Sequence, residues 1–140
     1  ENSFAPLLRP WHKSALVLGN GGATLAVVYV LSKLGIKNNV VSRSLHQGSS
    51  LTYDQLDKNI ISENLVIINT TPLGTYPNVD ECPPIPYAFI SGRHYLFDLV
   101  YNPSKTLFLK KGEERGAAIK NGYDMLGIQA EESWKIWNGR

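Results

Sequence analysis

A glycine-rich turn between two apolar segments is the part of this sequence best suited to chemistry. The run Leu16–Leu18 ends at Gly19, and Gly21 and Gly22 precede a second apolar stretch. Glycine lets the backbone approach a ligand closely, and N–H groups in the first turn of a helix favour negative charge. The spacing Gly19-x-Gly21 is that of dinucleotide-binding turns, although Thr24 occupies the third glycine position. The turn therefore predicts a site for the pyrophosphate of a dinucleotide.

A second candidate position follows the next apolar segment, where NAD-binding domains usually carry an acidic residue for the ribose 2′-hydroxyl. Here Arg43 stands between Ser42 and Ser44, and no acid follows until Asp54. An arginine with flanking hydroxyls suits a 2′-phosphate, because its planar fork of donors matches phosphate oxygens. An exposed loop arginine explains Arg43 alone equally well. Together with the glycine turn and the missing acid, Arg43 favours NADP as the cofactor.

Two further positions carry weaker signals. Asn69 and Thr70 offer amide and hydroxyl groups beside a Pro–Gly turn, where they could line the sugar–phosphate path of a cofactor. A plain Asx or ST turn explains the same residues about as well. Gln129 lies beside an apolar helical stripe, either as a boundary residue or as an amide aimed at a ligand. The histidines lack metal-ligand spacing and no acid–base pair stands near these turns, so we predict neither a metal site nor a catalytic residue.

Strands must alternate with helices to position these turns. The predicted strands are Ala15–Leu18, Asn39–Ser42, Leu65–Ile68, Tyr95–Asp98 and Ala117–Lys120, and the predicted helices are Gly22–Leu34, Leu51–Ile61, Thr106–Arg115 and Tyr123–Trp137. Five prolines make 70–86 a long loop. This alternation predicts an α/β fold with a Rossmann-like, doubly wound parallel sheet in three α/β/α layers. In such folds ligands lie at the carboxyl ends of the strands.

Composition sets the limits on function. The chain has 140 residues, 43% of them apolar, and a net charge of +2 from scattered basic residues, which does not point to nucleic acid. Cys82 is the single cysteine, so the sequence forms no internal disulfide. The absence of a membrane-span or signal-peptide pattern leads us to expect a cytoplasmic protein. The chain starts without methionine, and Phe4, Leu7 and Leu8 have helical spacing, which suggests a piece of a longer protein.

Five segments resemble, in order, motifs of the shikimate dehydrogenase family. They are the glycine turn Gly19–Ala23, the serine-flanked arginine Ser42–Ser44, the loop Asn69–Thr75, the segment Asp98–Pro103 and the helix start Gly122–Ala130. The resemblance implies an oxidoreductase of aromatic amino-acid biosynthesis, which uses NADP to reduce 3-dehydroshikimate to shikimate.

The resemblance also implies roles for individual residues. The pyrophosphate would be bound by Gly19, Asn20, Gly21, Gly22 and Ala23, and the 2′-phosphate would be surrounded by Ser42, Arg43 and Ser44. The nicotinamide end of the cofactor would lie against Leu99, Gly122 and Met125. The substrate would be contacted by Tyr101 and Gln129. Two residues depart from the family pattern. Gln47 stands where many members have a second basic residue, and Thr75 replaces a methionine.

The same resemblance predicts that half of the enzyme is missing. Residues 1–13 would be the remnant of an inter-domain helix and linker, and residues 14–140 the NADP-binding domain with its C-terminal helix. The catalytic Lys and Asp would lie in the absent substrate domain, so this chain alone would be inactive. Loss of that domain would expose the apolar face of Phe4, Leu7 and Leu8 to self-association. Two alternatives are an NAD-preferring quinate/shikimate dehydrogenase domain and a non-catalytic nucleotide-sensing domain.

Overall fold

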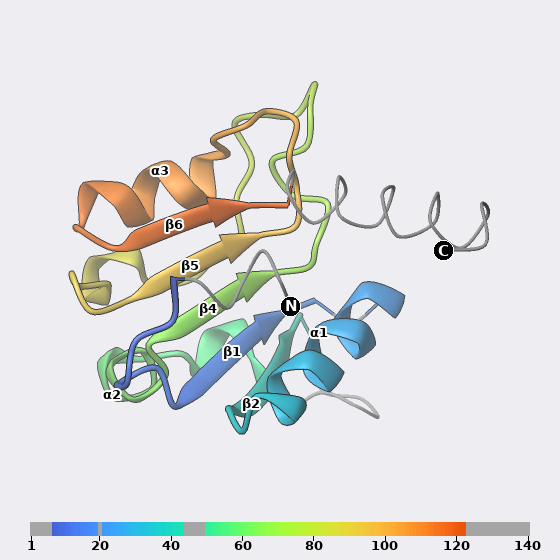
Figure 1. Cartoon of the computed structure of the whole chain (residues 1–140). Helices are drawn as coiled ribbons and strands as arrows, with labels where there is room; N and C mark the ends of the chain where they lie inside the picture. Colours follow the sequence, from blue (N-terminus) through green and yellow to red (C-terminus); the bar gives the residue numbers. More distant parts are fainter. Residues whose placement is uncertain (1–6, 20, 44–49, 123–140) are drawn as a thin grey trace, which may run out of the picture.

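A six-stranded parallel sheet forms the centre of the molecule (Figure 1). The computed structural model describes residues 7–19, 21–43 and 50–122. The strand order is β3-β2-β1-β4-β5-β6, and every neighbouring pair is parallel. The strands are β1 (Ser14–Leu18), β2 (Lys37–Ser42), β3 (Leu51–Thr52), β4 (Val66–Asn69), β5 (Tyr95–Asp98) and β6 (Ala118–Asn121); the helices are α1 (Gly22–Lys33), α2 (Lys58–Glu63) and α3 (Leu107–Glu114), with single 3-10 turns η2 (Tyr53–Gln55) and η3 (Tyr87–Phe89). The predicted doubly wound, Rossmann-like sheet is confirmed.

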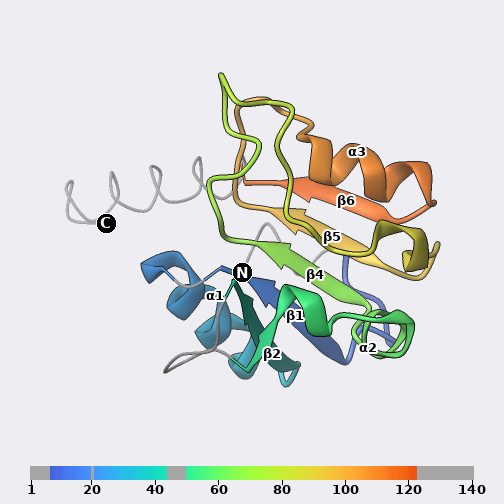
Figure 2. The ribbon, with the colours of Figure 1, turned by 180° about the vertical axis from the view of Figure 1, so that it is seen from behind.

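Helices cover both faces of this sheet, which is why its central strands are apolar on both sides. On one face Val17, Val40 and Ile68 form a cluster with Leu31 of α1. On the other face, seen in Figure 2, the cluster contains residues of α2 and α3, among them Phe108. The chain reverses direction of winding beside β1, so the loops that follow β1 and β4 lie next to each other at the carboxyl edge of the sheet.

Glycines end two of the helices as the sequence predicts. Gly35 follows α1 with φ +76°, and Gly116 follows α3 with φ +86°, both in the left-handed region that favours glycine. At the start of α3, the Thr106 hydroxyl accepts a hydrogen bond from the Leu109 N–H. The segment 70–86 contains no helix or strand, which confirms the predicted proline-rich loop. In the described part of the chain, no helix has the length and apolar content needed to cross a bilayer.

The predicted helix Leu51–Ile61 is wrong at its start, and only Lys58–Ile61 are α-helical, as part of α2. Leu51 and Thr52 instead form β3, which pairs with Val41 and Ser42 at the end of β2. A single 3-10 turn follows, and the Asp57 carboxylate then caps α2 by accepting the Ile60 N–H at 2.9 Å. Tertiary pairing with the open edge of β2 therefore overrides the weak helical periodicity, a common outcome for short segments.

Two N-terminal residues also correct an expectation. Leu7 and Leu8 are half-buried and pack against the cluster on the α1 face, so they are not an exposed apolar surface. The sheet supplies apolar area for them within the chain itself. Phe4 and the predicted helix Tyr123–Trp137 lie outside the described residues.

Candidate functional site

The glycine turn lies at the carboxyl end of the central strand β1. The Gly19 N–H donates to the Val41 carbonyl at 2.9 Å, which fixes the turn to β2. Gly19 has φ +126°, and a Cβ there would overlap the Thr70 hydroxyl, so both conformation and space require glycine. Gly21 is the N-cap of α1, and no described residue lies where a Cβ on Gly21 or Gly22 would meet it. The N-terminus of a 12-residue helix is therefore open at this edge of the sheet.

The end of β2 places an arginine beside that turn. Ser42 is buried at 6% exposure, whereas Arg43 is exposed. Burial raises the pKa of Tyr53, and the nearby positive charge of Arg43 acts in the opposite direction. Arg43 directly follows β2, at the carboxyl end of the sheet. β2 ends without an acidic residue, which agrees with the absence that the sequence indicated.

The end of β4 is held by its own side chain. The Asn69 amide oxygen accepts hydrogen bonds from the Thr71 N–H at 3.0 Å and the Thr71 hydroxyl at 2.6 Å. Asn69 is fully buried, so its amide organises the turn in the manner of the Asx-turn alternative. Thr70 lines the neighbouring pocket, but its proton is committed to the Leu18 carbonyl at 2.7 Å. Its hydroxyl also lies 2.8 Å from the Thr24 hydroxyl, so it is engaged in bonds within the protein.

A buried carboxylate organises the end of β5. One oxygen of Asp98 accepts from the Asn69 amide at 3.1 Å and from the Val100 N–H at 3.0 Å. The other oxygen accepts from the Thr106 hydroxyl at 2.6 Å. Burial raises the pKa of Asp98 to about 6, against the lowering effect of these three hydrogen bonds. Asp98 is fully buried and is not among the residues that line the pocket, so its carboxylate organises the loops around the site from beneath.

Three predicted site residues, Leu99, Tyr101 and Gly122, lie near the end of β5. Leu99 lines the pocket and is half-buried, while Tyr101 is 45% exposed at the pocket wall. Gly122 follows β6 and lies directly against Leu99, because a Cβ on Gly122 would overlap the Leu99 carbonyl oxygen. A glycine at this position therefore lets the chain after β6 approach the loop after β5.

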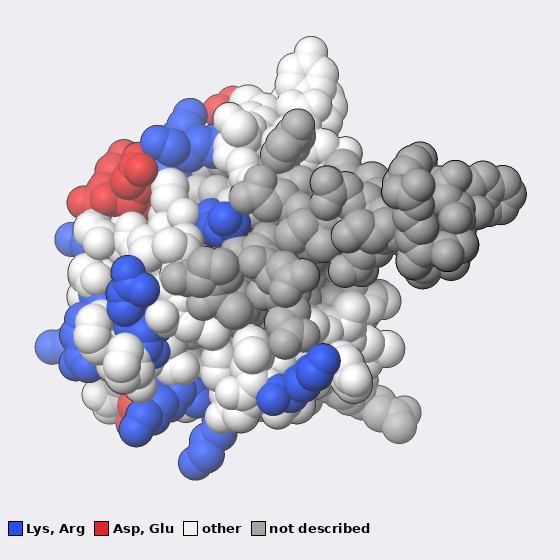
Figure 3. All heavy atoms as spheres, in the orientation of Figure 1, with Lys and Arg blue, Asp and Glu red and all other residues white. Residues whose placement is uncertain are grey.

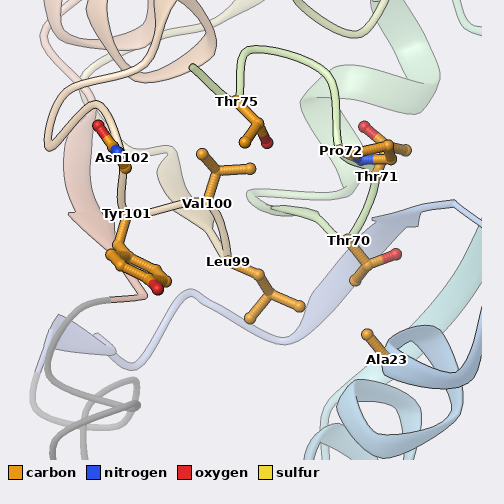
Figure 4. A pocket seen from close by; sticks show the side chains of 9 residues that line it. All are labelled: Ala23, Thr70, Thr71, Pro72, Thr75, Leu99, Val100, Tyr101 and Asn102. Carbon is orange, nitrogen blue, oxygen red and sulfur yellow. The ribbon is translucent and has the colours of Figure 1, made fainter. Parts of the chain in front are cut away.

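A pocket of about 470 Å³ lies where these loops meet. Figure 4 shows its lining, with Leu99 between Tyr101 on one side and Thr70 and Ala23 on the other. The remaining lining residues are Thr71, Pro72, Thr75, Val100 and Asn102. Among the described residues, no lining residue carries a carboxylate, a lysine or a histidine. On the face shown in Figure 3, most of the coloured charged side chains lie on the left, where the strands begin.

The structure thus brings together most of the predicted site residues. Around the carboxyl edge of β1, β4, β5 and β6 lie Gly19, Gly21, Gly22, Ala23, Thr70, Leu99, Tyr101 and Gly122. Ser42 and Arg43 lie at the end of β2. Asn20, Ser44, Gln47, Met125 and Gln129 lie outside the described residues. Within the described residues no group of three metal-ligating side chains is found.

Sequence reasoning missed the polar network beneath the pocket. Thr24, Asp98 and Thr106 are all nearly or fully buried and form side-chain hydrogen bonds at the strand ends. A signal was present in the sequence, because each is a short polar residue at the boundary of an apolar element, where an unpaired polar group would be costly. Thr24 and Thr70, however, are 46 positions apart, and Asn69 and Asp98 are 29 apart, so these pairings could not be deduced.

The sheet order and the glycine turn define the class of protein as a Rossmann-like α/β domain, in which dinucleotides bind across the crevice beside the central strand. No protein-family model matches the chain. Curated relatives do match it. The shikimate dehydrogenase (NADP(+)) of Methanococcus aeolicus is 41% identical over 136 residues, covering 89% of this chain and 49% of the relative. That of Methanococcus maripaludis is 40% identical over 142 residues, covering 91% and 50%.

Solved structures agree with these sequence matches. Shikimate dehydrogenase from Aquifex aeolicus is 35% identical, with a TM-score of 0.78 over 99% of this chain and 52% of that one. The enzyme from Thermus thermophilus, solved with NADP(H) and shikimate, is 27% identical, with a TM-score of 0.78 over 94% and 51%. The chain is thus homologous to shikimate dehydrogenases, and it spans about half the length of the relatives it matches.

Proposed function

We propose that this chain is the cofactor-binding domain of an NADP-dependent shikimate dehydrogenase, which reduces 3-dehydroshikimate to shikimate. Residues 14–140 would form the domain, and residues 1–13 would derive from the helix and linker that lead to a substrate domain. The observation that carries the proposal is the open glycine turn at the end of β1 with Arg43 beside it. Homology over about half of each relative supports the division into domains. A biosynthetic enzyme of this kind would act in the cytoplasm.

The described residues fit a dinucleotide. Gly21 and Gly22 leave room for a pyrophosphate against the backbone, and the N-terminus of α1 favours its charge. Arg43 would hold the 2′-phosphate together with Ser42 and Ser44, because a guanidinium binds phosphate through several donors at once. At the other end of the crevice, Leu99 and Gly122 would border the nicotinamide, with Met125 nearby.

The domain would orient the reactants without moving a proton. When bound, NADPH would supply a hydride from nicotinamide C4 to the carbonyl carbon of the substrate. Tyr101 would contact the substrate from the pocket wall, and Gln129 would also contact the substrate. Within the part of the chain that the structure describes, the pocket lining offers no lysine, histidine or carboxylate as a proton donor. We therefore assign proton transfer to a Lys and an Asp of the substrate domain, as the family resemblance implies.

Calorimetric titration of the 140-residue chain with NADP and with NAD tests the cofactor assignment. Arg43→Ala should weaken NADP binding by about tenfold or more, the effect of losing a charged hydrogen bond, and leave NAD binding unchanged. Lys37→Ala is the matched control, because it removes the same charge from the opposite end of β2. Equal losses for the two variants, or tighter binding of NAD by the unaltered chain, would count against NADP.

Turnover separates the remaining alternatives. The chain alone should show no shikimate oxidation above a blank without enzyme, and activity should return when a substrate domain is supplied. Turnover by the chain alone would refute the two-domain assignment. Binding of NADP with no activity in the presence of a substrate domain would support the nucleotide-sensing alternative.

A further inference from the structure

We propose that Thr24 and Thr70 are positioning residues that hold the glycine turn in its binding shape through a directed chain of hydrogen bonds. The inference rests on the proposed function, because it concerns how this turn receives NADP. Thr24 occupies the position at which dinucleotide-binding turns usually carry their third glycine. The Thr24 side chain at this position is only 3% exposed, and its hydroxyl forms a hydrogen bond with the Thr70 hydroxyl.

The proton positions in this chain of hydrogen bonds follow from simple chemistry. The Thr70 hydroxyl lies 2.7 Å from the Leu18 carbonyl, which can only accept, so Thr70 donates there. Thr24 and Thr70 are joined by a 2.8 Å contact between their hydroxyls, and Thr24 must be its donor. The Gly21 N–H in turn donates to the Thr24 hydroxyl at 3.2 Å. The bonds therefore run in one direction, from Gly21 through Thr24 and Thr70 to Leu18.

This chain of bonds connects the two walls of the pocket. Gly21 and Thr24 belong to the N-terminus of α1, while Thr70 begins the loop after β4. Figure 4 shows Ala23 and Thr70 facing each other across the lower part of the pocket. Because Gly19 lies so close to the Thr70 hydroxyl that a Cβ would overlap it, the two loops are in direct contact at this point. The hydroxyl pair therefore sets the distance between the two loops.

The bonds also determine which backbone groups are left for a ligand. The Gly19 N–H bonds to Val41, the Gly21 N–H to the Thr24 side chain, and the Thr24 N–H to the Gly21 carbonyl at 3.1 Å. These three donors are occupied within the protein. Thr24 thus fixes the N-cap without a side chain on Gly21. The N–H groups of Gly22 and Ala23 lie in the first turn of α1, where the helix itself supplies no acceptor for them.

Thr24→Val is the principal test, because valine keeps the branched shape and removes only the hydroxyl. We expect NADP binding to the 140-residue chain to weaken by about tenfold, the cost of losing one oriented hydrogen-bond network. Thr24→Ser retains the hydroxyl and should bind NADP within about threefold of the unaltered chain. Thr70→Val removes the next hydroxyl in the same series of hydrogen bonds. The double variant should bind about as weakly as either single variant, because each break already disconnects the turn.

Amide hydrogen exchange of Gly21 in the absence of cofactor provides a readout that does not depend on binding. Its N–H should exchange about tenfold faster or more in Thr24→Val and remain protected in Thr24→Ser. If the unaltered chain does not bind NADP, the proposed function fails. If it binds, but Thr24→Val and Thr70→Val bind equally well, the positioning inference fails. Additive losses in the double variant would also contradict it. Should Thr24→Val not fold, the comparison of Thr70→Val with Thr24→Ser decides by the same criteria.

Discussion

Because Asp98 is buried, we predict that its carboxyl makes the free energy of unfolding depend on pH. Its carboxyl is fully buried beneath the pocket and accepts hydrogen bonds from Asn69, Val100 and Thr106. Burial raises its pKa from 3.8 to about 6 in spite of those bonds. Between these two pH values the folded protein keeps a proton that the unfolded chain has lost. The free energy of unfolding must therefore fall as pH rises through this window.

The size of the effect follows from the shift. A rise in pKa from 3.8 to about 6 corresponds to about 3 kcal/mol of lost stability once the group is fully ionised. Because part of the loss occurs below pH 4.5, about 2 kcal/mol remains between about pH 4.5 and about pH 7.5. Other groups also titrate in this range, so the contribution of Asp98 must be isolated by comparison with a variant.

Asp98→Asn supplies that comparison. Asparagine can still accept from Val100 and Asn69, and it can donate to the Thr106 oxygen, but it does not titrate. Urea unfolding of both proteins at several pH values should show the variant gaining about 2 kcal/mol relative to the unaltered chain between about pH 4.5 and about pH 7.5. Asp80→Asn is the control for loss of one carboxylate, and its change should be well below this, since water screens an exposed group.

Two results would refute this reasoning. A difference between Asp98→Asn and the unaltered chain that does not change with pH would show that burial and hydrogen bonding cancel at Asp98. A difference of opposite sign would show that the three hydrogen bonds outweigh burial, so that the carboxylate form is the favoured one in the folded protein.

Three further predictions concern stability and are checked by urea unfolding. Gly122→Ala should cost about 1–3 kcal/mol, because its Cβ overlaps the Leu99 carbonyl and the backbone must shift; an unchanged midpoint would show that this close approach is not required. Leu16→Ala should cost about 2–5 kcal/mol, since Leu16 is fully buried in the central strand, and a loss below about 1 kcal/mol would contradict its place in the core. Asp57→Ala should cost about 1 kcal/mol through loss of the bond from the Ile60 N–H, and Asp57→Asn, which can also cap a helix, should retain most of the stability.

Strong local signals determined most of the fold. β1, β4 and β5 are short apolar runs that could only be buried strands, and the glycines after α1 and α3 ended helices where the sequence indicated. The start of the segment 51–61 was predicted wrongly because its weak helical period competed with an open strand edge on β2. Sequence spacing records the local preference of a segment, and it does not record which partner that segment will meet.

The candidate site divides in the same way. The sequence alone determined its chemistry: glycines that permit a close backbone approach, an arginine where an acid is usual, and strand ends that converge in a parallel sheet. Only the tertiary structure decided which polar groups remain available, by pairing Thr24 with Thr70 and Asp98 with Asn69 and Thr106. The physical reason is that a hydrogen bond between residues far apart in sequence depends on distances of a few tenths of an ångström. The packed sheet sets those distances, and no local pattern encodes them.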